Sequence, residues 1–250
     1  MDLSCLSLAS NLKTLILICD PPPGESSTFD LWSTLYSLST LPKLRDITIQ
    51  SRLSYLPEQG SNGLQLDNIR RLVLKVPLGN SVVPLLQCFS NISELDLYSG
   101  HYNKGRCGTF DICPFSHLSE TLESLSLHYL PWKESTIIGA FDMPMPKLKS
   151  LRLGLLDLPM DWMCKLPNAQ LPSLEVLNME PTDSLEVRPS CIALMVSSSK
   201  VPMLKEVTLT IPKEGKYHPG LDDMQLKELR EGLEMLDALL GERGIAFHSD

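Results

Sequence analysis

Two histidines and two cysteines in one polar stretch have side chains suited to binding a metal ion. They are His101, Cys107, Cys113 and His117, spaced as H-x5-C-x5-C-x3-H. Thiolates and imidazoles are the ligands that tetrahedral Zn²⁺ prefers, but zinc-binding loops usually place two cysteines only about two to four residues apart, and this stretch lacks such a pair. The alternative is a polar loop with incidental cysteines, which we favour. We therefore expect no bound metal.

The motifs that mark common catalytic and nucleotide-binding sites do not occur in the sequence. The nucleophile elbow G-x-S-x-G, the phosphate-binding loop G-x-x-x-x-G-K-[ST] and the dinucleotide fingerprint G-x-G-x-x-G are all missing. Serine, histidine and carboxylate side chains are present, but they define a reaction only when their geometry brings them together. The sequence therefore favours a protein that is not an enzyme and needs no cofactor.

A second group of polar residues is suited to binding another protein. Asp96, Tyr98, His128, Arg152 and Glu180 combine an aromatic ring with charges of both signs, as the anchors of protein interfaces often do. These residues are far apart in the chain, so they form a site only if the fold brings them side by side.

Repeats of the apolar pattern L-x-x-L-x-L predict the strands that would bring these polar residues side by side. The pattern is clearest at 146–153, read as PKLKSLRL, and its first positions advance in steps that average about 27 residues, close to the leucine-rich-repeat period. Eight triplets follow it: Leu12/Leu15/Leu17, Leu44/Ile47/Ile49, Ile69/Leu72/Leu74, Ile92/Leu95/Leu97, Leu122/Leu125/Leu127, Leu148/Leu151/Leu153, Leu174/Leu177/Met179 and Leu204/Val207/Leu209.

Each triplet predicts a short strand whose apolar residues face a core, and the remainder of each unit predicts a return segment. Proline leads into the strand four times, at Pro42, Pro146, Pro172 and Pro202, where it breaks any preceding helix. The predicted return helices are short and unequal: Phe29–Leu38, Ser81–Phe89, Lys133–Phe141, Asp161–Leu166 and Pro189–Val196.

The sequence therefore predicts an α/β fold, a horseshoe-like leucine-rich-repeat solenoid with a parallel concave sheet and an irregular helical convex side. Residues 1–220 would form an array of about eight repeats, and residues 221–250 a C-terminal cap. In that cap, Leu221–Leu240 has leucines at helical spacing and Ile245–Phe247 reads as an edge strand. The Asn or Cys that regular repeats carry after the L-x-L pair is absent, so we expect irregular curvature.

Residues between the apolar positions of each strand are expected to face outward and to line up across neighbouring strands, because side chains alternate along a strand. The middle of these outward-facing rows is the predicted partner-binding surface. The alternative is that these residues form an ordinary strand surface that contacts only solvent. The predicted binding residues are Asp96, Tyr98, Ser126, His128, Arg152, Asn178 and Glu180.

The first predicted strand is apolar on both faces, because Ile16 and Ile18 stand at its outward positions. Either a segment upstream covers it or it is an edge that promotes association. We favour the upstream segment and expect that an N-terminal portion precedes this sequence.

Net charge and cysteine usage indicate which classes of partner and which cellular compartment to expect. The formal charge is −8 and no basic stripe occurs, so nucleic acid and anionic membranes are not expected partners. Seven scattered cysteines without a secretory leader or an apolar run long enough to cross a bilayer indicate a reducing compartment, the cytoplasm or the nucleus.

The sequence resembles the leucine-rich-repeat region of fungal F-box proteins. The resemblance lies in degenerate repeats of the form L-P-x-L-x-x-L-x-L, as at Leu41–Ile49 and Leu171–Met179, and in the leucine-rich acidic C-terminal helix. The F-box itself, a short N-terminal helical motif, is not found. The resemblance implies a protein target on the concave face and a ubiquitin-ligase adaptor subunit as a second partner through an N-terminal segment.

Two hypotheses on function follow. The first is a non-enzymatic protein–protein recognition scaffold, the target-binding part of an F-box-type ubiquitin-ligase receptor. The second is a truncated or remnant repeat protein with a structural or unknown role and no connection to a ligase.

Overall fold

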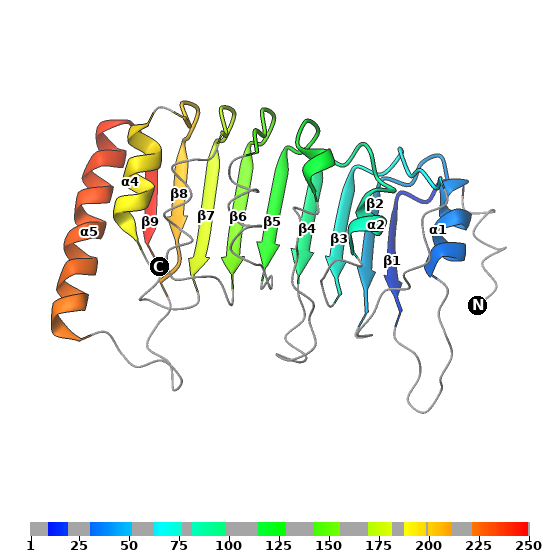
Figure 1. Cartoon of the computed structure of the whole chain (residues 1–250), viewed down its shortest axis with the longest axis horizontal. Coiled ribbons are helices and arrows are strands. Elements are labelled where there is room, and N and C mark those ends of the chain that lie inside the picture. The colour runs from blue at the N-terminus through cyan, green and yellow to red at the C-terminus, as the bar shows by residue number, and fades with distance from the viewer. Residues whose placement is uncertain are drawn as a thin grey trace.

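The computed structural model describes residues 10–19, 31–51, 63–76, 82–98, 115–128, 143–155, 170–181, 188–198, 200–211 and 222–249. Within these residues the chain is an α/β protein built on one open, parallel, nine-stranded sheet. The strands lie side by side in sequence order, from β1 at one end of the molecule to β9 at the other (Figure 1). The strands are β1 (Thr14–Ile18), β2 (Asp46–Gln50), β3 (Arg71–Lys75), β4 (Glu94–Tyr98), β5 (Ser124–His128), β6 (Ser150–Leu155), β7 (Val176–Pro181), β8 (Glu206–Leu209) and β9 (Ala246–Ser249).

The predicted triplets form the first eight strands in the predicted register. Leu95 of β4 pairs with Leu125 of β5, which pairs with Leu151 of β6, and the same row of apolar side chains runs across the whole sheet. A second row lies two residues further on. The apolar members of these rows on β2 to β8 are almost fully buried. They are Ile47, Leu72, Leu95, Leu125, Leu151, Leu177 and Val207 in one row, and Ile49, Leu74, Leu97, Leu127, Leu153, Met179 and Leu209 in the other.

Helices cover the apolar side of the sheet. In Figure 1 they lie in front of the strands, and the described residues include α1 (Leu31–Ser39), α2 (Val82–Leu86), the 3-10 turn η2 (Ser116–Leu118) and α4 (Pro189–Ser197). The helices predicted at Phe29–Leu38, Ser81–Phe89 and Pro189–Val196 are confirmed with small shifts of their ends. The predictions at Lys133–Phe141 and Asp161–Leu166 lie outside the described residues.

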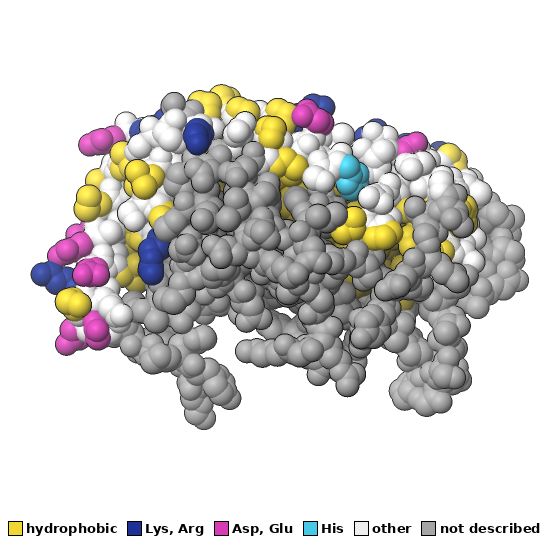
Figure 2. Space-filling view, in the orientation of Figure 1, with side chains coloured by type: hydrophobic (Ala, Val, Ile, Leu, Met, Phe, Trp, Pro, Cys, Tyr) yellow, Lys and Arg dark blue, Asp and Glu magenta, His cyan; other side chains and the backbone are white. Residues whose placement is uncertain are grey.

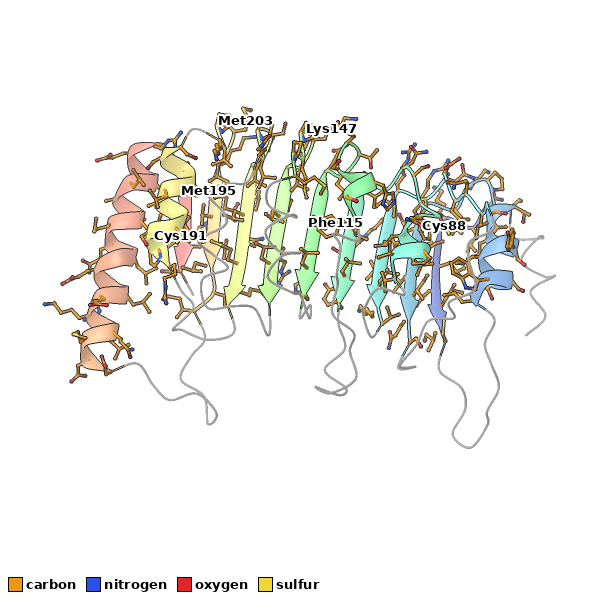
Figure 3. All side chains as sticks on the ribbon, in the orientation of Figure 1. Cys88, Phe115, Lys147, Cys191, Met195 and Met203 are labelled. Carbon is orange, nitrogen blue, oxygen red and sulfur yellow. The ribbon has the colours of Figure 1, made fainter. Side chains whose placement is uncertain are left out.

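The side chains of these helices and turns complete one continuous core with the strand leucines. Phe115, just before η2, and Cys88, just after α2, are both fully buried. Met195 and Cys191 of α4 are buried in the same way near the C-terminal end, and all four lie on the side of the sheet that the helices cover (Figure 3). The return segments therefore contribute apolar side chains even where they form only one helical turn.

Each proline before a strand is the second residue of a four-residue turn. Leu174 N–H donates to the carbonyl of Leu171 at 3.1 Å, which closes a turn around Pro172 and Ser173. Proline suits this position because its φ angle is already fixed near the required value. The same closure recurs at Leu41–Leu44, Met145–Leu148 and Val201–Leu204, and the turn residues Lys147 and Met203 lie at the ends of their strands in Figure 3.

Along one edge of the sheet, backbone carbonyls each accept two hydrogen bonds from the next unit and so link successive turns. The carbonyl of Lys149 accepts hydrogen bonds from the N–H groups of Glu175 and Val176, at 2.8 and 2.9 Å. Because each such bond connects one unit to the next, the strands keep one common register. The same double acceptance occurs at Lys13, Arg45, Arg70, Ser93, Glu123, Lys149 and Glu175.

The two ends of the sheet differ. At the C-terminal end, α5 (Asp223–Glu242) packs against α4 and β9, begins with a capping box between Asp222 and Gln225, and carries a charged outer surface (Figure 2). At the other end, Ile16 and Ile18 on β1 are 62% and 64% exposed. The predicted C-terminal helix and edge strand are thus present, at Asp223–Glu242 and Ala246–Ser249.

Candidate functional site

The side of the sheet opposite the leucine rows carries three rows of mostly polar side chains, which we call the outward face. Its rows hold the residues that alternate with the buried leucines and line up by strand register. The first row is Thr14, Asp46, Arg71, Glu94, Ser124, Ser150, Val176 and Glu206. The second is Ile16, Thr48, Val73, Asp96, Ser126, Arg152, Asn178 and Thr208. The third is Ile18, Gln50, Lys75, Tyr98, His128, Gly154 and Glu180.

An aromatic stack lies at the centre of the third row. The Tyr98 ring and the His128 imidazole are parallel to within 5°, with centroids 4.3 Å apart. The strand register explains this contact, because Tyr98 and His128 are directly paired on β4 and β5. Lys75, paired with Tyr98 on β3, places Nζ 5.5 Å from the centroid of the same ring. The structure thus brings together two residues that the sequence predicted as neighbours and adds a cation.

His128 lies on the outward face, as predicted, but it is buried there, with only 5% of its surface exposed. The cause is the next residue in the row, Gly154. A Cβ atom built on Gly154 would lie only 2.7 Å from Nδ1 of His128 and 3.3 Å from Oε2 of Glu180. Because glycine has no side chain, the imidazole can lie over β6, between Tyr98 and Glu180.

Arg152 and Glu180 form an ion pair across β6 and β7. Both Nε, at 3.0 Å, and a terminal guanidinium nitrogen of Arg152 donate to the same carboxylate oxygen of Glu180. Charge-assisted hydrogen bonds from two guanidinium nitrogens fix the orientation of both side chains. Arg152 remains about half exposed and Glu180 about a third exposed, so the pair is open to a partner.

Arg71, which is not among the predicted binding residues, holds Asp96 in place. One guanidinium nitrogen of Arg71 lies 3.4 Å from Oδ2 of Asp96, and Nε lies 3.6 Å from the carboxylate of Glu94. Arg71 stands in the first row, whereas the predicted residues all belong to the second and third rows. The period-two alternation of β3 was the signal that could have identified it.

The two remaining predicted residues lie between these pairs. Ser126 is flanked in register by Asp96 on β4 and Arg152 on β6, and Asn178 stands beside Arg152 on β7. Both are partly exposed. All seven predicted binding residues therefore occupy one contiguous area of the outward face on β4 to β7.

The charges on the outward face of β3 to β7 balance one another. Arg71, Lys75 and Arg152 supply three positive charges, and Glu94, Asp96 and Glu180 supply three negative ones. Burial, followed by the charge of Asp96, raises the pKa of Tyr98 above its ordinary value, so its hydroxyl stays protonated at neutral pH. Burial, followed by the charge of Arg152, lowers the pKa of His128, which is therefore neutral at neutral pH. The area is polar without a net charge.

Of the four histidines and cysteines with metal-binding side chains at positions 101–117, only His117 lies among the described residues. His117 lies in η2, where Nε2 is 3.0 Å from the carbonyl oxygen of Leu86. His101, Cys107 and Cys113 lie outside the described residues. Within the described part of the chain, His, Cys, Asp and Glu side chains form no group able to hold a metal ion.

The chain matches none of the protein-family models scanned, and none of the curated proteins searched is similar to it. None of the helices in the described ranges is long and apolar enough to cross a membrane.

Proposed function

We propose that this chain is a leucine-rich-repeat scaffold that binds a protein partner through the outward face of its sheet, without catalysing a reaction. The observation that carries the proposal is the fixed cluster of Tyr98, His128, Arg152 and Glu180 at the middle of an open nine-stranded sheet. Tyrosine and arginine are enriched among the residues that contribute most to protein binding.

The repetition of one structural unit supports the leucine-rich-repeat assignment. Strand order equals sequence order, so every unit contacts mainly its two neighbours. Strands β2, β3, β6, β7 and β8 are each entered through the same hydrogen-bonded turn, and the two buried rows run without a break from β2 to β8. These are the features of a solenoid built from short repeats. In such an array the sheet becomes the concave face, where an extended surface is available for recognition.

The geometry of the cluster favours a protein partner over a small molecule or nucleic acid. The area is a strand surface with balanced charges, without the excess of cations that phosphate backbones require. Its side chains are held by ion pairs and stacking, so little conformational entropy is lost when a partner binds.

The ligase connection rests on the sequence resemblance to F-box proteins. In this proposal the outward face selects the target, and a segment outside this array docks on the ubiquitin ligase. The alternative, a repeat protein without a ligase connection, predicts a target but no co-purifying ligase subunit.

Charge exchange at the Arg152–Glu180 pair tests the proposal. Three variants are compared by proximity labelling and affinity capture: Arg152→Glu, Glu180→Arg and the double exchange. The double exchange restores an internal ion pair, so a loss of stability seen in the single variants should be recovered. A partner that contacts the Arg152 and Glu180 charges directly should not be captured by any of the three variants.

An exposed pair on the strand-entry edge supplies the matched control. Lys205 Nζ lies 2.8 Å from the Glu175 carboxylate, away from the candidate site, and its double exchange should leave capture unchanged. If the Arg152–Glu180 double exchange captures the same partner as wild type, the outward face is not the binding surface. If a target is captured without a ligase subunit, the adaptor role is rejected and binding alone remains.

A further inference from the structure

Both faces of the Tyr98 ring are covered by neighbouring strands. His128 of β5 stacks on one face at 4.3 Å between centroids. Lys75 Nζ of β3 lies 5.5 Å from the centroid, and it covers the opposite face because β3 and β5 flank β4 on either side. A partner can therefore contact Tyr98 only through its ring edge and its hydroxyl.

The brace behind Tyr98 depends on Gly154. The imidazole of His128 lies where a side chain of residue 154 would otherwise begin, because Nδ1 is 2.7 Å from the position of a Cβ atom there. Any larger residue would push the imidazole back toward Tyr98 or out into solvent. The absence of a side chain at Gly154 thus sets the position of two aromatic rings.

The electrostatic surroundings select the kind of group that the Tyr98 hydroxyl can bind. Burial and the charge of Asp96 raise the pKa of Tyr98, so the hydroxyl is a neutral donor. The charges around Tyr98 on the outward face of β3 to β7 are three of each sign. Asp96, Glu180 and Glu94 are negative, and Arg152, Arg71 and Lys75 are positive. Since these balance, an ionised ligand gains no net attraction and would lose hydration on approach. A neutral acceptor has no such cost.

Building on the proposed function, we propose that Tyr98 is the hydrogen-bonding anchor of the outward face. Its hydroxyl donates a hydrogen bond to a neutral carbonyl of the partner, from the peptide backbone or from a carboxamide side chain. Gly154 is the positioning residue, because its lack of a side chain allows His128 to stack against the Tyr98 ring. A carbonyl bound in this way ties the partner to the middle of the sheet, next to the Arg152–Glu180 pair.

Random linear peptides displayed on phage provide the probe for the hydroxyl. Peptides are selected on the wild-type chain and kept only if they fail to bind the Arg152–Glu180 double exchange, and their affinities are then measured by calorimetry. Tyr98→Phe retains the ring and the stack but removes the donor, so we expect affinity to fall about fivefold. Tyr98→Ala removes the whole anchor and should lose more. Tyr36→Phe, at an exposed tyrosine on α1, is the matched control and should bind as wild type.

The outcomes separate this inference from the proposed function. If Tyr98→Phe binds as wild type while Tyr98→Ala does not, the hydroxyl anchor is rejected and the binding face stands. If the selected peptides share an acidic residue and lose affinity with added salt, the neutral acceptor is rejected. If no peptide depends on the Arg152–Glu180 pair, the proposed function of this face fails with it.

The positioning role of Gly154 is tested on the chain alone by NMR. Wild type should give nuclear Overhauser contacts between the rings of Tyr98 and His128. Gly154→Ala should weaken these contacts and shift the ring protons of Tyr98, while amide signals of the buried strand positions stay in place. Gly241→Ala, where nothing lies near the added methyl group, is the control. Unchanged ring contacts in Gly154→Ala would overturn the assignment.

Discussion

The two sides of the sheet are made from the same strands but follow opposite rules. On the buried side, β2 to β8 repeat leucine, isoleucine, valine or methionine in two rows, and each of these side chains is almost completely buried. On the outward face, the third row alone holds a lysine, a tyrosine, a histidine, a glycine and a glutamate in succession. The uniform apolar residues of the buried side specify how the units stack. The varied residue types of the outward face allow that surface to be specific for one partner.

The contacts on the two sides also differ in kind. Buried leucines are interchangeable neighbours, since each packs against apolar atoms of its own kind. The outward contacts are particular to one residue pair, such as the Tyr98–His128 stack or the Arg152–Glu180 bridge. Substitutions on the buried side should therefore change stability, and substitutions on the outward face should mainly change local geometry and binding.

The largest effect should come from the buried side of β4. Leu97→Ala removes a fully buried side chain and leaves a cavity between two neighbouring strands, so we expect the free energy of unfolding to fall by about 2–5 kcal/mol. Ser126→Ala, on the outward face of the adjacent strand, should change it by no more than about 0.5 kcal/mol. Urea unfolding followed by circular dichroism measures both, and equal losses would remove the distinction between the two sides.

Gly154 is the outward position where stability should respond most. Gly154→Ala places a methyl group 2.7 Å from Nδ1 of His128, so the imidazole must move, and overpacking of this kind costs about 1–3 kcal/mol. Gly241→Ala in α5 meets no atom within 4 Å and should be neutral or slightly stabilising. If both variants unfold at the wild-type urea concentration, the stack is not a packed element.

The pH dependence of stability should show the burial of His128. Its pKa is lowered in the folded chain, mainly by burial and then by Arg152, with Glu180 and Asp96 opposing the shift. The unfolded chain then binds more protons between the two pKa values, so stability is fully present above about pH 6.5 and is lost as the pH falls through the folded pKa. His128→Phe keeps a ring but cannot titrate. The wild-type loss relative to this variant should therefore appear only below about pH 6.5, and parallel curves would contradict a buried neutral imidazole.

The smallest effect should be at an exposed ion pair. Lys149 Nζ lies 2.7 Å from the Glu123 carboxylate on the strand-entry edge, and this hydrogen bond lowers the pKa of Glu123 and raises that of Lys149. Both side chains are about half exposed, so water and salt screen the pair. Lys149→Met should shift the urea midpoint slightly at low salt and leave it unchanged at high salt. A shift that persists at high salt would indicate a packing role for the lysine.

Much of the buried side could be predicted from the sequence. The L-x-x-L-x-L spacing predicted eight strands and their register. Alternation along each strand and repetition along the chain both indicate the same residues as core-facing. Proline located the turns, although its role as the second residue of a hydrogen-bonded turn appeared only in the structure. Three return helices were predicted from local apolar spacing with small errors at their ends.

The candidate site was predicted only in outline. Alternation placed Tyr98, His128 and Arg152 on the outward face, but the prediction did not include the first row, where Arg71 stands. Alternation also gave no sign that the His128 side chain is buried on that face. Both features depend on contacts between units, which no pattern within one repeat contains.

The sequence by itself determined that successive units form parallel strands in one register, since each unit carries the information for its own strand and turn. Only the tertiary structure decided that a glycine on β6 gives space to a histidine on β5, and that this histidine in turn supports Tyr98 on β4. The physical reason is distance along the chain. Hydrophobic periodicity acts within a few residues, whereas the shape of the outward face arises from side chains that meet only after three separate units have packed together.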